Sequence, residues 1–95
     1  MTNYLQIERS NQFKRDYKKA KKQGKDLILL HKVIELLCAQ KPLPEKFRDH
    51  SLSHNWSSYR ELHLSGDWLL IYRIVSTEKL LQLARLGSHA ELFKM

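Results

Sequence analysis

The chain has 95 residues, of which 42% are hydrophobic, and its 17 Lys and Arg outnumber its 10 Asp and Glu to give a net charge of +7. A chain of this length can build one hydrophobic core, so we expect residues 1–95 to form a single domain. Its apolar runs are much shorter than the roughly 20 residues that span a bilayer, and its first ten residues lack the pattern of a secretory signal. We therefore expect a cytoplasmic protein with no membrane partner.

The excess positive charge is concentrated near the N-terminus. Residues 1–25 contain eight Lys and Arg against two Asp and Glu, a balance of +6, whereas residues 26–95 contain nine against eight, a balance of +1. A one-sided basic surface is typical of proteins that meet nucleic acid, the ribosome or an acidic partner protein. A lysine-rich helix face that is simply solvated explains the composition equally well.

The first half of the chain predicts a strand followed by two helices. Apolar and polar residues alternate over residues 5–9, which indicates a short strand. Ser10 is a suitable N-cap for a helix that ends at Gly24. Asp26 is a suitable N-cap for a second helix, which ends before Pro42. Because the link between the two helices is short, we expect an antiparallel helix hairpin.

The second half predicts a long loop, three strands and a helical turn. Residues 41–58 have no clear periodicity, and long loops in small proteins are usually functional. Strand-like runs follow over residues 59–64, 68–75 and 79–86, with links short enough for antiparallel hairpins. Ser88 then caps a short C-terminal helix. The predicted fold is an α+β domain with a mostly antiparallel, four-stranded sheet, an N-terminal helix hairpin and a short C-terminal helix.

Histidines gather in two stretches of this second half, residues 48–67 and 87–93, which hold four of the five in the chain. Imidazole has an unperturbed pKa of about 6.5, so a group of histidines can supply both a general base and a general acid near neutral pH. Strand alternation places Glu61 and His63 on one face. The candidate site consists of His50, Glu61, His63, Asp67, Arg85 and His89.

Individually, these histidines and charged residues are weak signals, because structural roles explain such residues as well. For His31 and His54 we favour a surface or hydrogen-bonded structural role. For Asp67 and Arg85 taken alone, a turn cap or a structural ion pair explains the residue at least as well as catalysis.

Two segments together resemble a known family. They are KFRDHSLSHNWSSYRELHLSGDWLLIYR, residues 46–73, and LARLGSHAELF, residues 83–93. Both resemble the YafQ branch of the RelE/ParE toxin superfamily, which carries D-H-x-L…W…Y-R-[DE]-x-H…D-W-x-L-I-Y and ends in R-x-G-[ST]-H-x-x-L-F. The resemblance implies a RelE-like fold and a type II toxin that cuts mRNA in the ribosomal A site. It also implies a cognate antitoxin that holds the toxin inactive.

The resemblance also implies roles for individual residues. The functional histidines of the family fall on His50, His63 and His89. Its acidic residue falls on Asp67, its arginine on Arg85 and its C-terminal phenylalanine on Phe93. Glu61 stands where relatives often have aspartate, which makes it a supporting residue.

The residue types favour a mechanism without metal or cofactor. No Cys/His group has zinc spacing, and the acidic residues are too few and scattered for a two-metal nuclease. RNA carries its own nucleophile, the 2′-OH. We expect His50 or His63 to remove its proton and His89 to protonate the leaving 5′-oxygen. Asp67 would fix the tautomer of a histidine, and Arg85 would contact the phosphate.

Two further roles concern RNA binding. Phe93 could stack on a displaced base. The basic residues of the helix hairpin could hold ribosomal RNA phosphates, and they are Lys14, Arg15, Lys18, Lys19, Lys21, Lys22 and Lys25.

Two other functions compete with the nuclease. One is a non-enzymatic toxin of the ParE type, which inhibits DNA gyrase and is not expected to concentrate three histidines. The other is an RNA-binding adaptor whose histidines serve only as hydrogen-bonding residues.

Overall fold

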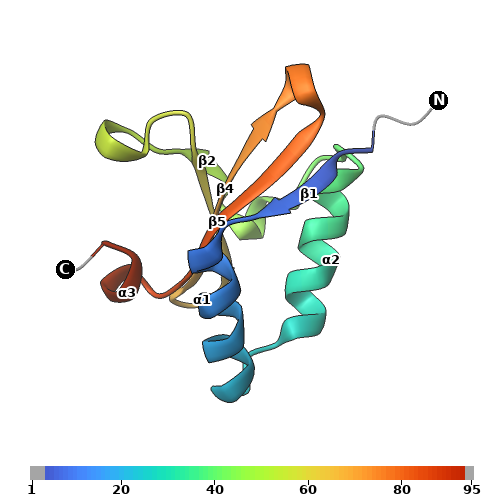
Figure 1. The fold of residues 1–95 in the computed structure, drawn as a ribbon. Coiled ribbons are helices and arrows are strands. Elements are labelled where there is room, and N and C mark those ends of the chain that lie inside the picture. Colours follow the sequence, from blue (N-terminus) through green and yellow to red (C-terminus); the bar gives the residue numbers. More distant parts are fainter. Residues whose placement is uncertain (1–3, 94–95) are drawn as a thin grey trace.

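The computed structural model describes residues 4–93, and its elements follow one another as a strand, two helices, four strands and a final helix (Figure 1). They are β1 Gln6–Arg9, α1 Asn11–Lys22, α2 Leu27–Cys38, β2 His50–Ser51, β3 Arg60–Ser65, β4 Trp68–Val75, β5 Leu80–Gly87 and α3 His89–Phe93. Short 3-10 turns occupy Glu45–Phe47, His54–Trp56 and Ser76–Glu78.

The strands form one sheet in the order β1-β5-β4-β3-β2. Strand β1 pairs with β5 in parallel, and all other pairs are antiparallel. The predicted α+β class is therefore confirmed, but the predicted count of four strands is wrong by one. The fifth strand, β2, lies inside the predicted loop, where His50 pairs with Glu61 and Ser51 with Arg60. Two residues are too few to show the alternation by which a strand is recognised in a sequence.

The helix hairpin forms where the sequence predicts it. Ser10 accepts a hydrogen bond from the backbone N–H of Phe13 at 2.9 Å, and Asp26 accepts one from Leu29 at 3.0 Å. Between the helices Gly24 has φ +73°, a backbone conformation that residues other than glycine rarely adopt. The main core lies between these helices and one face of the sheet, with Leu30, Leu62 and Leu81 fully buried.

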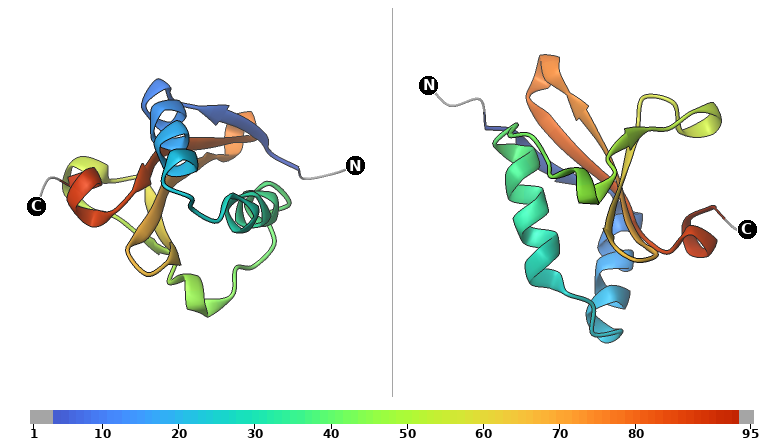
Figure 2. Two further views of the ribbon diagram at one scale, coloured as in Figure 1. Left: turned by 90° about the horizontal axis from the view of Figure 1, so that it is seen from below. Right: turned by 180° about the vertical axis from the view of Figure 1, so that it is seen from behind.

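The opposite face of the sheet carries a smaller apolar cluster and the candidate site. Leu69 and Ile71 of β4 are fully buried there, and Leu92 of α3, which is 5% exposed, packs against them. The views in Figure 2 show that α3 and the segment before β3 lie on the other side of the sheet from α2. Helix α3 meets α1 at one point, where Glu91 forms an ion pair with Lys19. The described segments that cover this face are thus short, which leaves room for a site. No helix among residues 4–93 is long and apolar enough to cross a membrane.

Candidate active site

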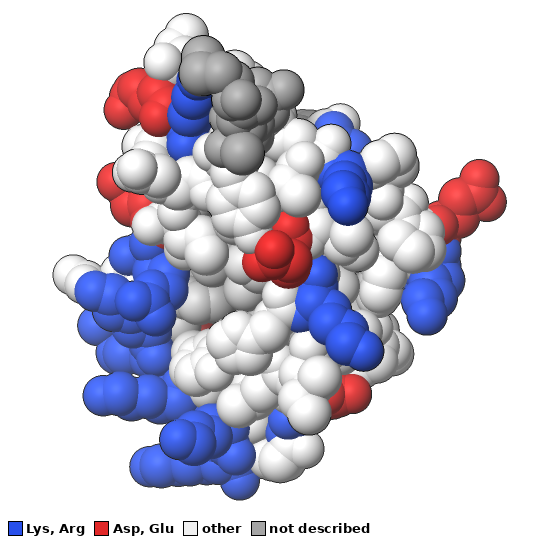
Figure 3. Space-filling view, turned by 90° about the vertical axis from the view of Figure 1, so that its right-hand side faces the viewer, with Lys and Arg blue, Asp and Glu red and all other residues white. Residues whose placement is uncertain are grey.

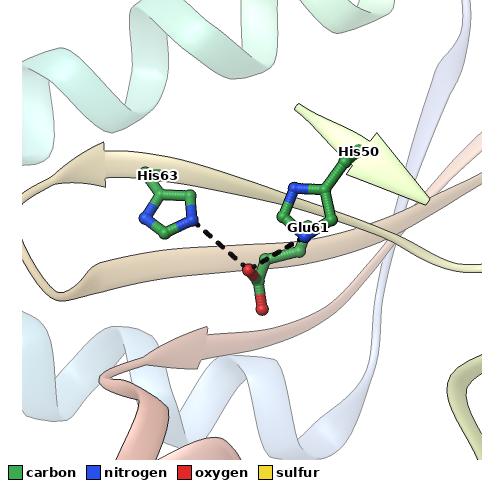
Figure 4. A group of neighbouring side chains, drawn as sticks. All are labelled: His50, Glu61 and His63. Atoms are coloured by element: carbon green, nitrogen blue, oxygen red, sulfur yellow. Dashed lines mark ion pairs between the residues drawn. The ribbon is translucent and has the colours of Figure 1, made fainter. Parts of the chain in front are cut away.

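Three histidines surround the carboxylate of Glu61. Strand β3 places Glu61 and His63 on the second sheet face, β2 brings His50 opposite Glu61, and α3 brings His89 from the end of the chain. Glu61 Oε1 lies 3.4 Å from His50 Nε2, 3.4 Å from His63 Nε2 and 3.9 Å from His89 Nε2. Figure 4 shows the first two of these contacts. The fold therefore gathers three imidazoles that the sequence separates by up to 39 positions (89 − 50).

The group is open on one side. The Glu61 side chain is 5% exposed, whereas those of His50 and His89 are 50% and 40% exposed. His63 lies between them, with its ring centroid 6.1 Å from that of His50 and 5.7 Å from that of His89. The carboxylate thus forms the floor of the site and the imidazoles its rim. A polymer can approach the imidazole nitrogens without entering a closed cavity.

Arg48 fixes the orientation of two of these rings. His50 Nδ1 lies 2.7 Å from the Arg48 carbonyl, which only accepts, so this nitrogen carries a proton. The Arg48 guanidinium lies 3.5 Å from His63 Nδ1, and since guanidinium only donates, the His63 proton belongs on Nε2. Arg48 has left-handed backbone geometry, with φ 47°, which brings its carbonyl and side chain to different rings. Sequence reasoning missed this residue, although it precedes Asp49-His50 in the segment that carries the resemblance.

Asp67 orients the third ring. It follows Gly66 in the turn between β3 and β4, and its Oδ1 lies 2.6 Å from His89 Nδ1. The same oxygen accepts the His89 backbone N–H at 3.0 Å. The backbone bond and then the imidazole hold the pKa of the Asp67 carboxyl below its usual value. His89 therefore keeps Nδ1–H on Asp67 and turns Nε2 toward Glu61.

Asp49 anchors the loop that carries His50. The Tyr72 hydroxyl donates to Asp49 Oδ1 at 2.5 Å, and Arg60 Nε lies 3.2 Å from both carboxylate oxygens. Burial, together with the neighbouring carboxylate, raises the pKa of Tyr72. Sequence reasoning also missed Asp49, because no pattern in the nearby sequence indicates that it binds Arg60 on β3 and Tyr72 on β4.

Arg85 lies on the same face of the sheet as the histidines, but two strands away from β3. Glu61 pairs with Ile71, and Ile71 with Arg85, so one strand separates the arginine from Glu61. Arg85 Nε instead donates to Asp16 Oδ2 of α1 at 2.8 Å, and Asp16 also accepts the Leu86 N–H at 3.0 Å. Asp16 was overlooked as the lone acidic residue of α1. Its ion pair gives Arg85 a structural role beside the predicted catalytic one.

Aromatic rings form the wall beside His89. The Phe93 ring centroid lies 6.1 Å from that of His89 and 6.4 Å from that of Trp56. The Trp56 ring in turn meets Tyr59 edge-on at 5.3 Å. Phe93 thus lies beside the histidine group, which is the position that the predicted stacking on a base near the cut site requires.

The seven basic residues predicted for the helix hairpin are all exposed. In Figure 3, Lys and Arg side chains gather along one side and the lower end of the molecule, while the rest of that face is mostly uncharged. Two of these residues reach the neighbourhood of the site. Lys19 forms an ion pair with Glu91 of α3, and Lys25 lines the same hollow as Asp67.

The site also contains a ligand set for a metal ion. The closest ligand atoms of His50, Glu61 and His63 all lie within 4.8 Å of one another. Two imidazoles and a carboxylate suit Zn²⁺ or Cu²⁺. The metal-free reaction stays a prediction, because these three residues could also hold a metal ion.

A family model described as "Bacterial toxin of type II toxin-antitoxin system, YafQ" matches residues 5–94. The chain belongs to the YafQ family. The mRNA interferase toxin YafQ of Escherichia coli (strain B / BL21-DE3) is 44% identical over 88 residues, covering 92% of this chain and 94% of the relative.

Solved structures of related toxins share the fold. YafQ in the E. coli DinJ-YafQ toxin-antitoxin complex has a TM-score of 0.84 and 41% identity, with 95% of this chain and 98% of that chain covered. A metal-bound toxin from Helicobacter pylori has a TM-score of 0.89 and 47% identity, with 94% and 99% covered.

Proposed function

We propose that this YafQ-family toxin cuts mRNA on the ribosome by metal-free attack of the RNA 2′-oxygen on phosphorus. The protein is an endoribonuclease of the mRNA interferase class and the toxin of a type II toxin-antitoxin pair. The observation that supports the mechanism best is the convergence of His50, His63 and His89 on Glu61 Oε1 at 3.4 to 3.9 Å. Three imidazoles that face one space can remove one proton and supply another within a single step.

The hydrogen bonds favour His50 as the base. Its proton is committed to the Arg48 carbonyl through Nδ1, which leaves the Nε2 lone pair for the 2′-OH proton. His63 carries its proton on Nε2, toward Glu61, because Arg48 faces its Nδ1. As the 2′-oxygen bonds to phosphorus, the bond from phosphorus to the 5′-oxygen breaks. The products are a 2′,3′-cyclic phosphate and a 5′-hydroxyl.

His89 suits the role of acid. Asp67 holds its Nδ1–H, so the proton delivered to the 5′-oxygen comes from Nε2, which faces the site. Positive charge on the imidazole is balanced by an adjacent carboxylate that stays ionised. After transfer the ring is neutral and retains its bond to Asp67.

Three other residues would act on the phosphate and the bases. The Arg48 guanidinium at the rim can balance charge that develops on the phosphorane. Arg85 binds Asp16 through Nε and Nη2, and its Nη1 has no partner among residues 4–93. We assign that nitrogen to the phosphate. Phe93 would stack on a displaced base, an interaction worth about 1 to 3 kcal/mol.

The basic helix hairpin would carry the ribosome contact. Its cations extend from the exposed side of α1 to Lys25, which borders the hollow beside Asp67. Ribosomal RNA phosphates held there would present the mRNA to the histidines. A toxin that cuts mRNA on the ribosome would act in the cytoplasm. A cognate antitoxin is its partner, as DinJ is for YafQ in the E. coli complex.

Metal binding would compete with this reaction. The similar H. pylori toxin was crystallised with metal bound. At His50, Glu61 and His63 a metal would occupy the lone pair that the base needs, so we infer that it inhibits.

End mapping of cellular mRNAs after brief expression tests the proposal. Wild-type protein should produce new 5′ ends within coding sequences, and folded His89→Ala should produce none. DNA damage signalling with intact mRNA would instead support a gyrase inhibitor of the ParE type. Growth arrest that persists in all three histidine mutants would support an RNA-binding adaptor.

A further inference from the structure

A second polar hollow lies on the same sheet face as the histidines. Its volume is about 370 Å³, and it is lined in part by Glu8, Arg9, Tyr59, Arg73 and Gln82. Along β4, Ile71 stands beside Glu61, and Arg73 is the next residue that points to this face. Same-face residues of a strand are about 7 Å apart. The hollow is therefore adjacent to the candidate active site, on the side away from Asp67.

Two uncharged groups, the Tyr59 ring and the Gln82 amide, hold the guanidinium of Arg73 in place and do not neutralise its positive charge. It lies 4.7 Å from the Tyr59 ring centroid, and its Nε and Nη2 donate to Gln82 Oε1 at 2.9 and 2.6 Å. Gln82 donates to Glu8 Oε1 at 2.6 Å, which fixes the amide and occupies that carboxylate. Among residues 4–93 no carboxylate lies within ion-pair distance of Arg73, whereas Arg60 and Arg85 each pair with an aspartate.

An arginine held in this way is prepared for an anion. A guanidinium fixed by an aromatic ring and an amide loses little side-chain entropy on binding, and its remaining N–H groups match phosphate geometry. Arg9, at the edge of the sheet, also lines the hollow and forms no ion pair in the described part of the chain. Together the two arginines outweigh Glu8, the one carboxylate of the lining.

A continuous series of rings joins the hollow to the histidines. Tyr59 meets Trp56 at 5.3 Å, Trp56 meets Phe93 at 6.4 Å, and Phe93 meets His89 at 6.1 Å. Single-stranded nucleic acid binds along such surfaces because bases stack on rings while cations hold the backbone.

We propose that the hollow is a second RNA subsite, in which Arg73 binds a backbone phosphate of the mRNA strand near the scissile linkage. This inference rests on the proposed function, since it needs RNA as the substrate. It assigns the strand a path across the sheet, from the histidines past Phe93 and Trp56 to Arg73. The ligand group is a phosphodiester of single-stranded RNA.

The test combines protein variants with a neutral linkage in the RNA. Ribosomes are programmed with a synthetic mRNA whose cut site has been mapped, and each nearby phosphodiester is replaced in turn by an uncharged methylphosphonate. Cleavage is measured under single turnover as a function of toxin concentration. The proteins are wild type, Arg73→Gln, Arg9→Gln and Lys32→Gln, a control that removes one exposed charge from α2.

We expect Arg73→Gln to raise the half-saturating toxin concentration about tenfold, the effect of losing one charge-assisted hydrogen bond, with the maximal rate unchanged. One methylphosphonate position should have the same effect on wild type and almost none on Arg73→Gln. Arg9→Gln should act in the same direction, and Lys32→Gln should match wild type.

Several outcomes would overturn the subsite. If wild type cleaves but no methylphosphonate position depends on Arg73, the mRNA strand does not bind there. If Arg73→Gln weakens binding equally for every RNA, including the unmodified one, the hollow contacts ribosomal RNA instead. A wild-type protein that does not cleave, or that still cuts an mRNA with a 2′-deoxy nucleotide at the cut site, contradicts the proposed function itself.

Discussion

Asp67 binds both the backbone and the imidazole of His89 through one carboxylate oxygen, with distances of 3.0 Å to the backbone nitrogen and 2.6 Å to Nδ1. The two residues come from the β3–β4 turn and the start of α3, which the chain separates by 22 positions. This double contact fixes where α3 begins and which nitrogen of His89 faces Glu61. Position and tautomer of the proposed acid thus depend on one exposed carboxylate.

Asp67→Asn should slow cleavage without weakening RNA binding. The amide keeps the shape of the side chain but lacks the charge that balances a protonated imidazole, so we expect kcat to fall by about 10- to 100-fold with KM unchanged. Single-turnover cleavage on programmed ribosomes measures both quantities. Asp26→Asn is the matched control, because asparagine caps α2 as well as aspartate does. An unchanged kcat in Asp67→Asn would remove Asp67 from the mechanism.

The same carboxylate should make stability depend on acidity. The pKa of Asp67 is lowered in the folded protein, so its contribution to stability is fully present above its unfolded value of about 3.9 and is lost as pH falls through the lower, folded value. Thermal unfolding should therefore give wild type a higher Tm than Asp67→Asn at pH 6. The difference should shrink at pH values below about 4. A difference that stays constant down to pH 2 contradicts this account.

Mutants of Asp16 and Arg85 should distinguish the structural role of this ion pair from the proposed catalytic role of Arg85. Asp16→Ala leaves the Arg85 guanidinium and the Leu86 N–H without their acceptor, which should lower the free energy of unfolding by about 2 to 3 kcal/mol. Urea unfolding measures this loss. At a temperature where both variants are folded, Arg85→Ala should lower kcat about a hundredfold, while Asp16→Ala should keep most of its activity. Equal activities in the two variants would leave Arg85 with only its structural role.

Metal ions should inhibit and not activate. Cleavage should be unchanged in EDTA, provided that the ribosomes keep the Mg²⁺ they need, and added Zn²⁺ should slow it by binding at His50, Glu61 and His63. Calorimetry should find this Zn²⁺ site in His31→Ala and not in His63→Ala. His31 is a suitable control because it bonds to Tyr17 on the helix hairpin, at 2.9 Å. Loss of cleavage in EDTA that Zn²⁺ restores would reverse the conclusion.

The sequence predicted most of the fold because its strongest local signals agree with the tertiary structure. The caps at Ser10 and Asp26 and the hairpin links all act over a few residues, and the structure has each of them. Strand β2 and the parallel pairing of β1 with β5 could not be predicted in this way. Strand β2 is too short to show a periodic signal, and the partner of β1 depends on a contact between segments that are distant in the chain.

The candidate site was likewise predicted only in part. Residue types and family resemblance selected the three histidines and Asp67, and the structure brings these side chains together. Arg48, which orients His50 and His63, was missed because it acts partly through its backbone carbonyl. A carbonyl is present at every position and becomes informative only when the fold places it 2.7 Å from an imidazole.

The chemistry of the cleaved ends tests the central claim most directly. RNA cut by the purified toxin on programmed ribosomes can be analysed by mass spectrometry, with an mRNA that has a 2′-deoxy nucleotide at the cut site as control. Acid and base catalysis by the histidines around Glu61 predicts a 2′,3′-cyclic phosphate, a 5′-hydroxyl and no cleavage of the deoxy substrate. A 5′-phosphate, or cleavage of the deoxy substrate at an undiminished rate, would contradict it.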